Sequence, residues 1–171
     1  MNNKTRFSIE IFGAASIVAS LIFVGIQLIQ DRTVARGAQF DNRAAAGIQM
    51  HISRFENDAY IQDVVDRWEH GAARRWFNED VQAFQDRMGI SDKGLYRLNL
   101  SVRMSAINFD NNFYQYQLGL MDEEDWLSIR ANQKRTLQSP LNRAVYQTMD
   151  GMRPQAKLEV SRIISELETT N

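Results

Sequence analysis

An uncharged apolar run over residues 11–29 constrains this chain more than any other feature of its sequence. Its few polar side chains belong to Ser16, Ser20 and Gln27. As an α-helix the run rises by about 28 Å, close to the hydrocarbon thickness of a bilayer, and a helix pairs its backbone amides internally. We therefore predict an N-terminal tail over residues 1–10, a transmembrane helix over 11–30 and a helical domain over 31–171.

An apolar run of this kind also occurs in signal peptides, in buried core helices and in interfacial helices. A cleaved signal peptide has a shorter apolar core and a small-x-small cleavage site, whereas this core is long and is followed by Gln30, Asp31 and Arg32. A core helix of a soluble protein seldom stays uncharged on all sides over this length. An interfacial helix needs a charged face, which the run lacks. The membrane span is the preferred interpretation.

The basic residues that flank the run set its predicted orientation. Lys4 and Arg6 precede it, and Arg32, Arg36 and Arg43 follow it. Lysine and arginine are enriched on the cytoplasmic side of a span, and acidic residues count little. The two flanks differ by little, and the difference favours a cytoplasmic location for the helical domain.

One face of the predicted span carries the small side chains of Ala15, Ser16, Ala19 and Ser20, and Gly13 lies on the adjoining side. Small residues four positions apart allow two helix backbones to approach closely in lipid. The pattern thus predicts packing against a membrane protein partner or a second copy of the chain. The alternative is that the residues are small because alanine, serine and glycine are common in any span.

The chain as a whole has the composition of a folded protein. Hydrophobic residues make up 44% of the sequence and charged residues 24%, a globular balance. The net charge of −1 offers no basic excess for nucleic acid. The absence of cysteine excludes disulfides, thiolate metal sites and a cysteine nucleophile.

Apolar residues at helical spacing predict an all-α fold in which the transmembrane helix continues into a soluble helical bundle. The expected face of the continuing helix is Val34, Ala38, Asp41, Ala45, Ile48, Ile52 and Phe55. Further helices are predicted over 58–69, 80–88, between Ser91 and Gly119, from 122, over 140–149 and from 154. The helix between Ser91 and Gly119 is apolar on two sides, which predicts a central position.

Two groups of residues in this domain are candidates for function. Asn111 lies in an apolar stripe, where a buried amide needs partners, so we expect a polar network with a tyrosine hydroxyl and a ligand pocket near Asn111, Tyr114 and Tyr116. Residues 74–77, Arg-Arg-Trp-Phe, suggest contact with anionic headgroups. The preferred interpretation of this second group is solvated arginines beside two core aromatics.

The sequence offers no catalytic, cofactor or metal motif. His51 and His70 are the two histidines, and the Glu-x-x-His pairs of di-iron bundles do not occur. There is no glycine-rich phosphate loop and no serine nucleophile elbow. The acidic run over 122–125 is typical of a first helical turn, where the helix dipole favours negative charge.

Three stretches of the chain carry a family resemblance: IVASLIFVGIQLIQDRTVARGAQF, NFDNNFYQYQLGLMDEEDW and SPLNRAV. They resemble a family of small bacterial single-pass membrane proteins with an N-terminal span, an arginine-containing juxtamembrane helix and a helical C-terminal domain. The resemblance implies a location in a bacterial inner membrane, and it implies no activity, cofactor or catalytic residue.

Two functions are compatible with these predictions. The first is a non-enzymatic interaction protein, either an accessory or scaffolding subunit of a membrane complex or a self-associating protein. The second is a small-ligand-binding protein or an enzyme with a pocket inside the bundle. A deep cavity with convergent polar groups favours the second, and a flat apolar patch favours the first.

Overall fold

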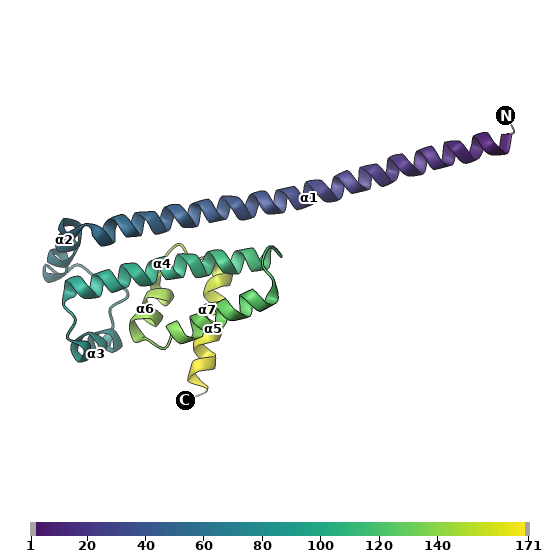
Figure 1. The fold of residues 1–171 in the computed structure, drawn as a ribbon. Helices are drawn as coiled ribbons and strands as arrows, with labels where there is room; N and C mark the ends of the chain where they lie inside the picture. The colour runs from purple at the N-terminus through teal and green to yellow at the C-terminus, as the bar shows by residue number, and fades with distance from the viewer. Residues whose placement is uncertain (1–2, 170–171) are drawn as a thin grey trace. The chain divides into compact units, whose positions relative to one another are not determined.

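The computed structural model describes residues 3–169, in which every regular element is an α-helix (Figure 1). The helices are α1 Asn3–Glu56, α2 Asp58–Glu69, α3 Glu79–Met88, α4 Asp92–Gln117, α5 Glu123–Thr136, α6 Pro140–Thr148 and α7 Pro154–Glu168. The prediction of an all-α fold is confirmed. The chain divides into two compact units, residues 1–39 and 40–171, so residues 31–39 group with the N-terminal unit.

Side-chain caps determine where several helices begin. The Asn57 and Asn78 side chains accept from Tyr60 N at 2.9 Å and from Val81 N at 3.0 Å. Ser91 and Asp122 cap the next two helices in the same way, by accepting from Gly94 N at 3.2 Å and Asp125 N at 2.8 Å. Each cap satisfies an amide that lacks a partner within its own helix. Asn57, Ser91 and Asp122 are capping residues, and for this reason sequence alone indicates where α2, α4 and α5 begin.

The N-terminal unit consists of the first part of α1. By length and composition this apolar helix is a candidate for crossing a membrane, with a mean hydropathy of 2.2 over its most apolar window. Its large apolar side chains are exposed, for example Phe12 at 78% and Leu21 at 67%. No contact within the described chain buries this window.

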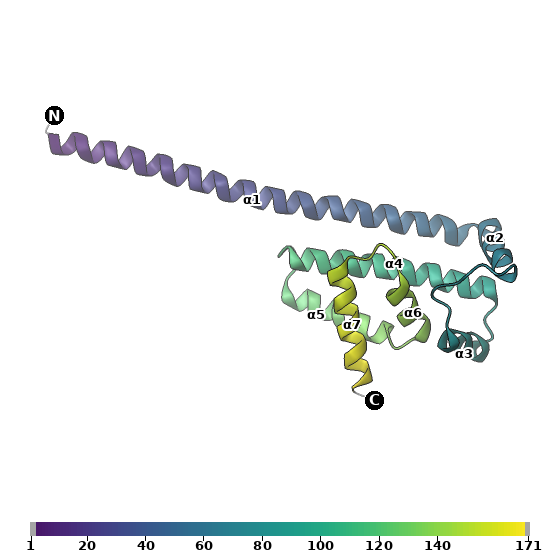
Figure 2. The same cartoon turned by 180° about the vertical axis from the view of Figure 1, so that it is seen from behind.

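The second unit is organised around α4. Helices α2, α5, α6 and α7 all pack against α4, and α5, α6 and α7 gather on one side of it in both views (Figures 1 and 2). One apolar cluster joins α4 to α5, α6 and α7 through residues such as Phe109, Trp126, Tyr146 and Ile163. A second joins α3, α4 and α6 around Val81, Leu95 and Val145.

The part of α1 that belongs to this unit uses a different face from the one predicted. Ala45 is exposed and Phe55 is 37% exposed, whereas Ala44 and His51 are buried. The physical reason is close approach: a Cβ added at Gly47 would lie 3.3 Å from the Ile107 side chain of α4. Small residues let the two helices meet there, and the aliphatic residues of the predicted stripe fall partly outside the contact.

Candidate functional site

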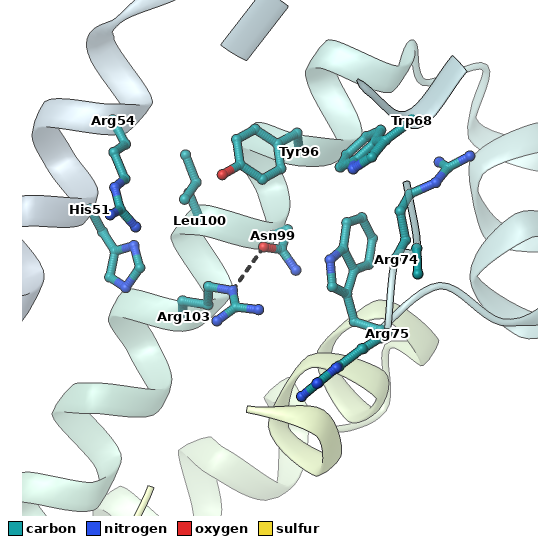
Figure 3. A pocket seen from close by; sticks show the side chains of 11 residues that line it. His51, Arg54, Trp68, Arg74, Arg75, Tyr96, Asn99, Leu100 and Arg103 are labelled. Atoms are coloured by element: carbon teal, nitrogen blue, oxygen red, sulfur yellow. Dashed lines mark hydrogen bonds between the residues drawn. The ribbon is translucent and has the colours of Figure 1, made fainter. Parts of the chain in front are cut away.

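A cavity of about 280 Å³ lies among the end of α1, α2, the segment between α2 and α3, and α4. The residues that line it are His51, Arg54, Trp68, Ala73, Arg74, Arg75, Trp76, Tyr96, Asn99, Leu100 and Arg103. Figure 3 shows Arg103 and Asn99 at its centre, with His51 and Arg54 on the α1 side and Arg74 and Arg75 on the other. Its volume is near the lower end of the range for small-molecule sites.

Helical spacing places the α1 and α4 side chains on the cavity. Tyr96, Asn99 and Arg103 are three and four residues apart, so they lie on one face of α4. His51 and Arg54 are likewise three apart on α1. Two elements that are distant in sequence therefore each present a basic residue, and α4 adds the buried amide of Asn99 beside Arg103.

The third wall comes from the segment between α2 and α3. Gly71 follows the end of α2 and has a φ of +87°, a conformation that favours glycine. The chain turns at this residue. Backbone bonds from Ala72 N to Arg67 O at 2.9 Å and from Phe77 N to Arg74 O at 2.9 Å hold the segment in shape. The segment thereby becomes an ordered wall of the cavity.

Aromatic rings form a continuous group on this wall. The Trp68 ring packs edge-to-face against Trp76 at 5.7 Å and against Tyr96 at 5.4 Å between centroids. The Arg74 guanidinium lies 4.6 Å from the Trp68 ring centroid and 3.9 Å from that of Phe77, a cation–π arrangement. These contacts fix the rings and give the cavity an apolar surface beside its charged one.

Residues 74–77 divide between the two interpretations made of them from sequence. Trp76 is 6% exposed and belongs to a core cluster, and the Arg74 side chain is 22% exposed. Arg75 is solvated, at 76% exposed. Both arginines also line the cavity, a role that neither interpretation included.

Positive charge dominates the cavity. Four arginines line it, and none of its lining residues, all within the described range, is Asp or Glu. Arg75 pairs with Asp150 at 2.9 Å, and Arg74 lies 3.7 Å from Asp92. Within residues 12–169, whose side chains the structure describes, Arg54 and Arg103 form no ion pair. The cavity therefore carries uncompensated positive charge.

Several residues of the cavity carry buried polar atoms that lack a hydrogen-bond partner. Five buried side-chain nitrogen or oxygen atoms of the described residues lack a hydrogen-bond partner, and three of them belong to cavity residues: His51 Nδ1, Arg74 Nη1 and Asn99 Nδ2. Asn99 is 1% exposed, and its Oδ1 already accepts from Arg103 Nε at 3.0 Å. Buried polar groups are almost always hydrogen-bonded, so these atoms are available to bind water or a polar ligand.

The same environment shifts two pKa values. Burial lowers the pKa of His51 below its ordinary value, and the nearby charges of Arg103 and Arg54 lower it further. Burial raises the pKa of Tyr96, and its hydrogen bond with Tyr60 at 3.4 Å raises it as well. His51 is thus held neutral and Tyr96 protonated at neutral pH.

The pocket residues expected from sequence lie elsewhere on α4. Asn111 is 8% exposed and donates to Asp41 Oδ1 at 2.7 Å, so the partner found is a carboxylate and not a tyrosine hydroxyl. Tyr114 packs on Phe40, and the Arg153 guanidinium lies 4.2 Å from the Tyr114 ring centroid. Tyr116 stacks on Trp126 at 5.2 Å between centroids. None of the three lines the arginine cavity.

A second cavity, of about 300 Å³, lies closer to these residues. It is lined by Phe40, Arg43, Ala44, Gly47, Ala106, Ile107, Asp110, Met149, Gly151 and Met152. Its lining is mainly apolar, and its acidic member Asp110 already accepts from Arg153 at 3.1 Å. It lacks the unpartnered donors of the arginine cavity.

The five small residues predicted to pack against another helix are exposed in the described structure: Gly13, Ala15, Ser16, Ala19 and Ser20. The Ser16 and Ser20 hydroxyls each donate to a backbone carbonyl one turn earlier, at 2.8 Å. Both polar groups are satisfied within the helix, which leaves a smooth surface of small side chains. Nothing in the described chain packs on a Cβ added at Gly13.

Sequence reasoning missed Arg54, Asn99 and Arg103 as site residues. A signal for two of them was present, because Tyr96, Asn99 and Arg103 interrupt the apolar pattern on a single face of α4. Comparison with known proteins adds no further assignment, because no protein-family model, curated protein or solved structure matches this chain.

Proposed function

We propose that this chain is a single-pass membrane protein whose soluble helical bundle binds a partner at the membrane. In this proposal it serves as an accessory or scaffolding subunit of a membrane complex, or associates with itself. The bundle faces the cytoplasm, and the family resemblance of the sequence favours a bacterial inner membrane.

The observation that carries the proposal is the exposed apolar surface of α1 between residues 12 and 29. Ile17, Leu21 and Phe23 are each more than 60% exposed, and no acidic or basic side chain interrupts the surface. Such a surface in water is unfavourable by roughly 25 cal/mol per Å² of apolar area, and a bilayer removes that cost. The hydroxyls of Ser16 and Ser20, bonded to their own helix, add no unsatisfied group in lipid.

A cross-linking experiment tests the association. Replacing Ala15 and Ala19 with leucine widens the small-residue face and should abolish cross-linking of the chain to its partner in membranes, with the helical content unchanged. The matched control is Ala14→Leu, which adds a leucine on a different face of the same helix. Full association of the double variant would show that this face makes no such contact.

A second function, small-ligand binding by the helical domain, is favoured by one specific observation. The arginine cavity combines uncompensated charge with three unpartnered polar atoms. Convergent polar groups in a cavity are typical of ligand sites. Binding here is compatible with membrane anchoring, because the cavity lies in the second compact unit and the apolar surface of α1 lies in the first.

A further inference from the structure

We propose that the arginine cavity binds the phosphate group of a small phosphate monoester, held by Arg103, Arg75, Arg54 and the Asn99 amide. The proposal rests on the second function above, ligand binding, and is independent of membrane anchoring. It extends that function by assigning the site and the chemical class of the ligand.

The charge of the cavity favours an anion as its ligand. Arg54 and Arg103 have no carboxylate partner in the described part of the chain, and no lining residue is acidic. Water can accept from a donor but does not offset like charges gathered around one space. A cation would meet four guanidinium groups. A bound anion is the species that compensates the charge.

The unpartnered donors show where that anion makes its contacts. Asn99 is 1% exposed and its Nδ2 has no acceptor, while the Oδ1 of the same amide is held by Arg103 Nε. The Arg103 bond fixes the orientation of the amide, so its NH₂ group is committed as a donor. Figure 3 shows Arg103 and Asn99 side by side, which suits two donors for one oxygen-bearing group.

The arrangement of the donors favours phosphate over carboxylate. Arg54 comes from α1, Arg75 from the segment after α2, and Arg103 with Asn99 from α4. Donors from three elements approach from several sides. A carboxylate offers two oxygens in one plane, whereas a phosphate monoester offers three terminal oxygens in a tetrahedral arrangement and carries up to two negative charges. Guanidinium groups bind such oxygens well.

The remaining space indicates an organic group attached to the phosphate. A cavity of about 280 Å³ exceeds the space that inorganic phosphate needs, and Trp68, Trp76, Tyr96 and Leu100 line the rest of it. Aromatic side chains accept apolar or planar groups. The ligand thus has a compact, partly apolar body. A free phosphorylated metabolite and the headgroup of a phosphatidic acid share this chemistry.

Binding to the full chain in an uncharged detergent tests the proposal. The probes are inorganic phosphate and phenyl phosphate, and phenol is the neutral control. Calorimetry and tryptophan fluorescence measure their binding. Two of the three tryptophans line the cavity, and Trp126→Phe removes the third from the signal. Phenyl phosphate should bind saturably and more tightly than inorganic phosphate, and phenol should not bind.

Substitutions then assign the site. Arg103→Gln should weaken phenyl phosphate binding about tenfold, the expected loss for a charge-assisted hydrogen bond. Arg97→Gln is the matched control, because Arg97 lies on the same helix but outside the cavity and pairs with Asp58. Arg75→Gln provides a second test at a largely exposed position, where folding is not at risk. Helical content is measured for every variant.

The binding results distinguish whether phosphate binds at all, whether it binds in this cavity, and whether it belongs to a lipid or to a free ligand. Absence of saturable binding by both inorganic phosphate and phenyl phosphate would overturn the proposal. Saturable binding that Arg103→Gln and Arg75→Gln leave unchanged would overturn this site, with ligand binding elsewhere in the domain still supported. Competition by phosphatidic acid, with phosphatidylcholine as the diester control, would identify a lipid headgroup as the source. Lack of that competition would identify a free monoester.

Discussion

Asp41 and Asn111 show how two polar residues become compatible with a helix contact. Each interrupts an apolar stripe on its own helix, and the Asn111 amide donates to the Asp41 carboxylate at 2.7 Å. Asn111 is 8% exposed, so without this bond its Nδ2 would be buried and unpaired. An unsatisfied buried donor destabilises a fold more than the bond itself stabilises it.

Substitution of Asp41 tests this pairing. Asp41→Ala should lower the free energy of unfolding by about 1 kcal/mol, because Asn111 loses its acceptor. Asp41→Asn should cost clearly less, since its amide oxygen can accept the same bond. Urea unfolding of both variants measures the difference. Equal losses in the two variants would mean that the bond contributes nothing beyond packing.

His51 reports on the charge of the arginine cavity. Burial and the charges of Arg103 and Arg54 lower its pKa below the ordinary value of 6.5. The unfolded chain therefore binds a proton more readily than the folded one near pH 6. The contribution of His51 to stability is fully present above pH 6.5 and declines as the pH falls through its folded pKa.

An NMR titration of the two histidines measures this effect, with exposed His70 as the internal reference. Arg103→Gln should raise the pKa of His51 by removing a nearby positive charge, and Arg97→Gln should leave it unchanged. Phenyl phosphate should also raise it, since an anion offsets the arginines. If neither Arg103→Gln nor the ligand moves the His51 midpoint, the guanidinium charge does not reach the imidazole.

At the scale of elements, an ion-pair cluster joins α5 to α7. The Arg130 Nε donates to Glu159 at 2.7 Å, and its terminal nitrogens donate to Glu166. These bonds raise the pKa of Arg130, and the hydrogen bond from Arg130 lowers that of Glu166. Glu159 is the critical member, because its side chain is 9% exposed and needs a partner.

Arg130→Met keeps most of the side-chain volume and removes the charge, so it should lower the free energy of unfolding by about 2 kcal/mol. Lys134→Met is the matched control. Its ammonium bonds Glu166 at 3.3 Å on the surface, and its loss should cost under about 0.5 kcal/mol. Because the Glu166 pKa is lowered, the contribution of Glu166 to the free energy of unfolding is present above pH 4.5 and fades at lower pH. Denaturation at two pH values measures this change.

The elements that sequence predicted well are those with local signals. Asn57, Ser91 and Asp122 are capping residues, and Gly119 adopts a φ of +70° after α4, so their positions mark helix ends without knowledge of the fold. The packed face of α1 was not predictable in this way. Its contact depends on Gly47 meeting Ile107, which is distant along the chain, and helical periodicity alone favoured the aliphatic stripe.

The arginine cavity escaped prediction for a related reason. Its basic residues are separated along the chain and meet only when α1, α2 and α4 have packed. Residues 74 and 75 stand out in the sequence because they are adjacent, whereas Arg54 and Arg103 look like ordinary surface arginines there. The local signal is confined to α4, where Asn99 and Arg103 share a face, and it does not show that arginines from other elements join them.

At the scale of the whole molecule, the two compact units differ in how far their apolar side chains are exposed. In residues 12–29 the apolar side chains are exposed, whereas residues 40–171 bury two apolar clusters and carry most of the charged side chains. Neither of these clusters includes a described residue of the first unit. The proposed bilayer supplies an apolar surrounding for the exposed side chains of the first unit.

Fractionation of cells tests this difference. The full chain should remain in the membrane pellet after alkaline carbonate, because that treatment strips proteins held by surface charge and leaves spanning helices in lipid. A chain beginning at residue 33 should be soluble without detergent and should keep the helical signal of the remaining residues, since both apolar clusters lie beyond that point.

The matched control replaces Leu21 and Phe23 with arginine in the full chain. Charge at the centre of a span costs several kcal/mol, so this variant should leave the carbonate pellet. Release of the unaltered full chain by carbonate would mean that α1 does not cross the membrane, and its exposed apolar surface would then have to be covered by another protein.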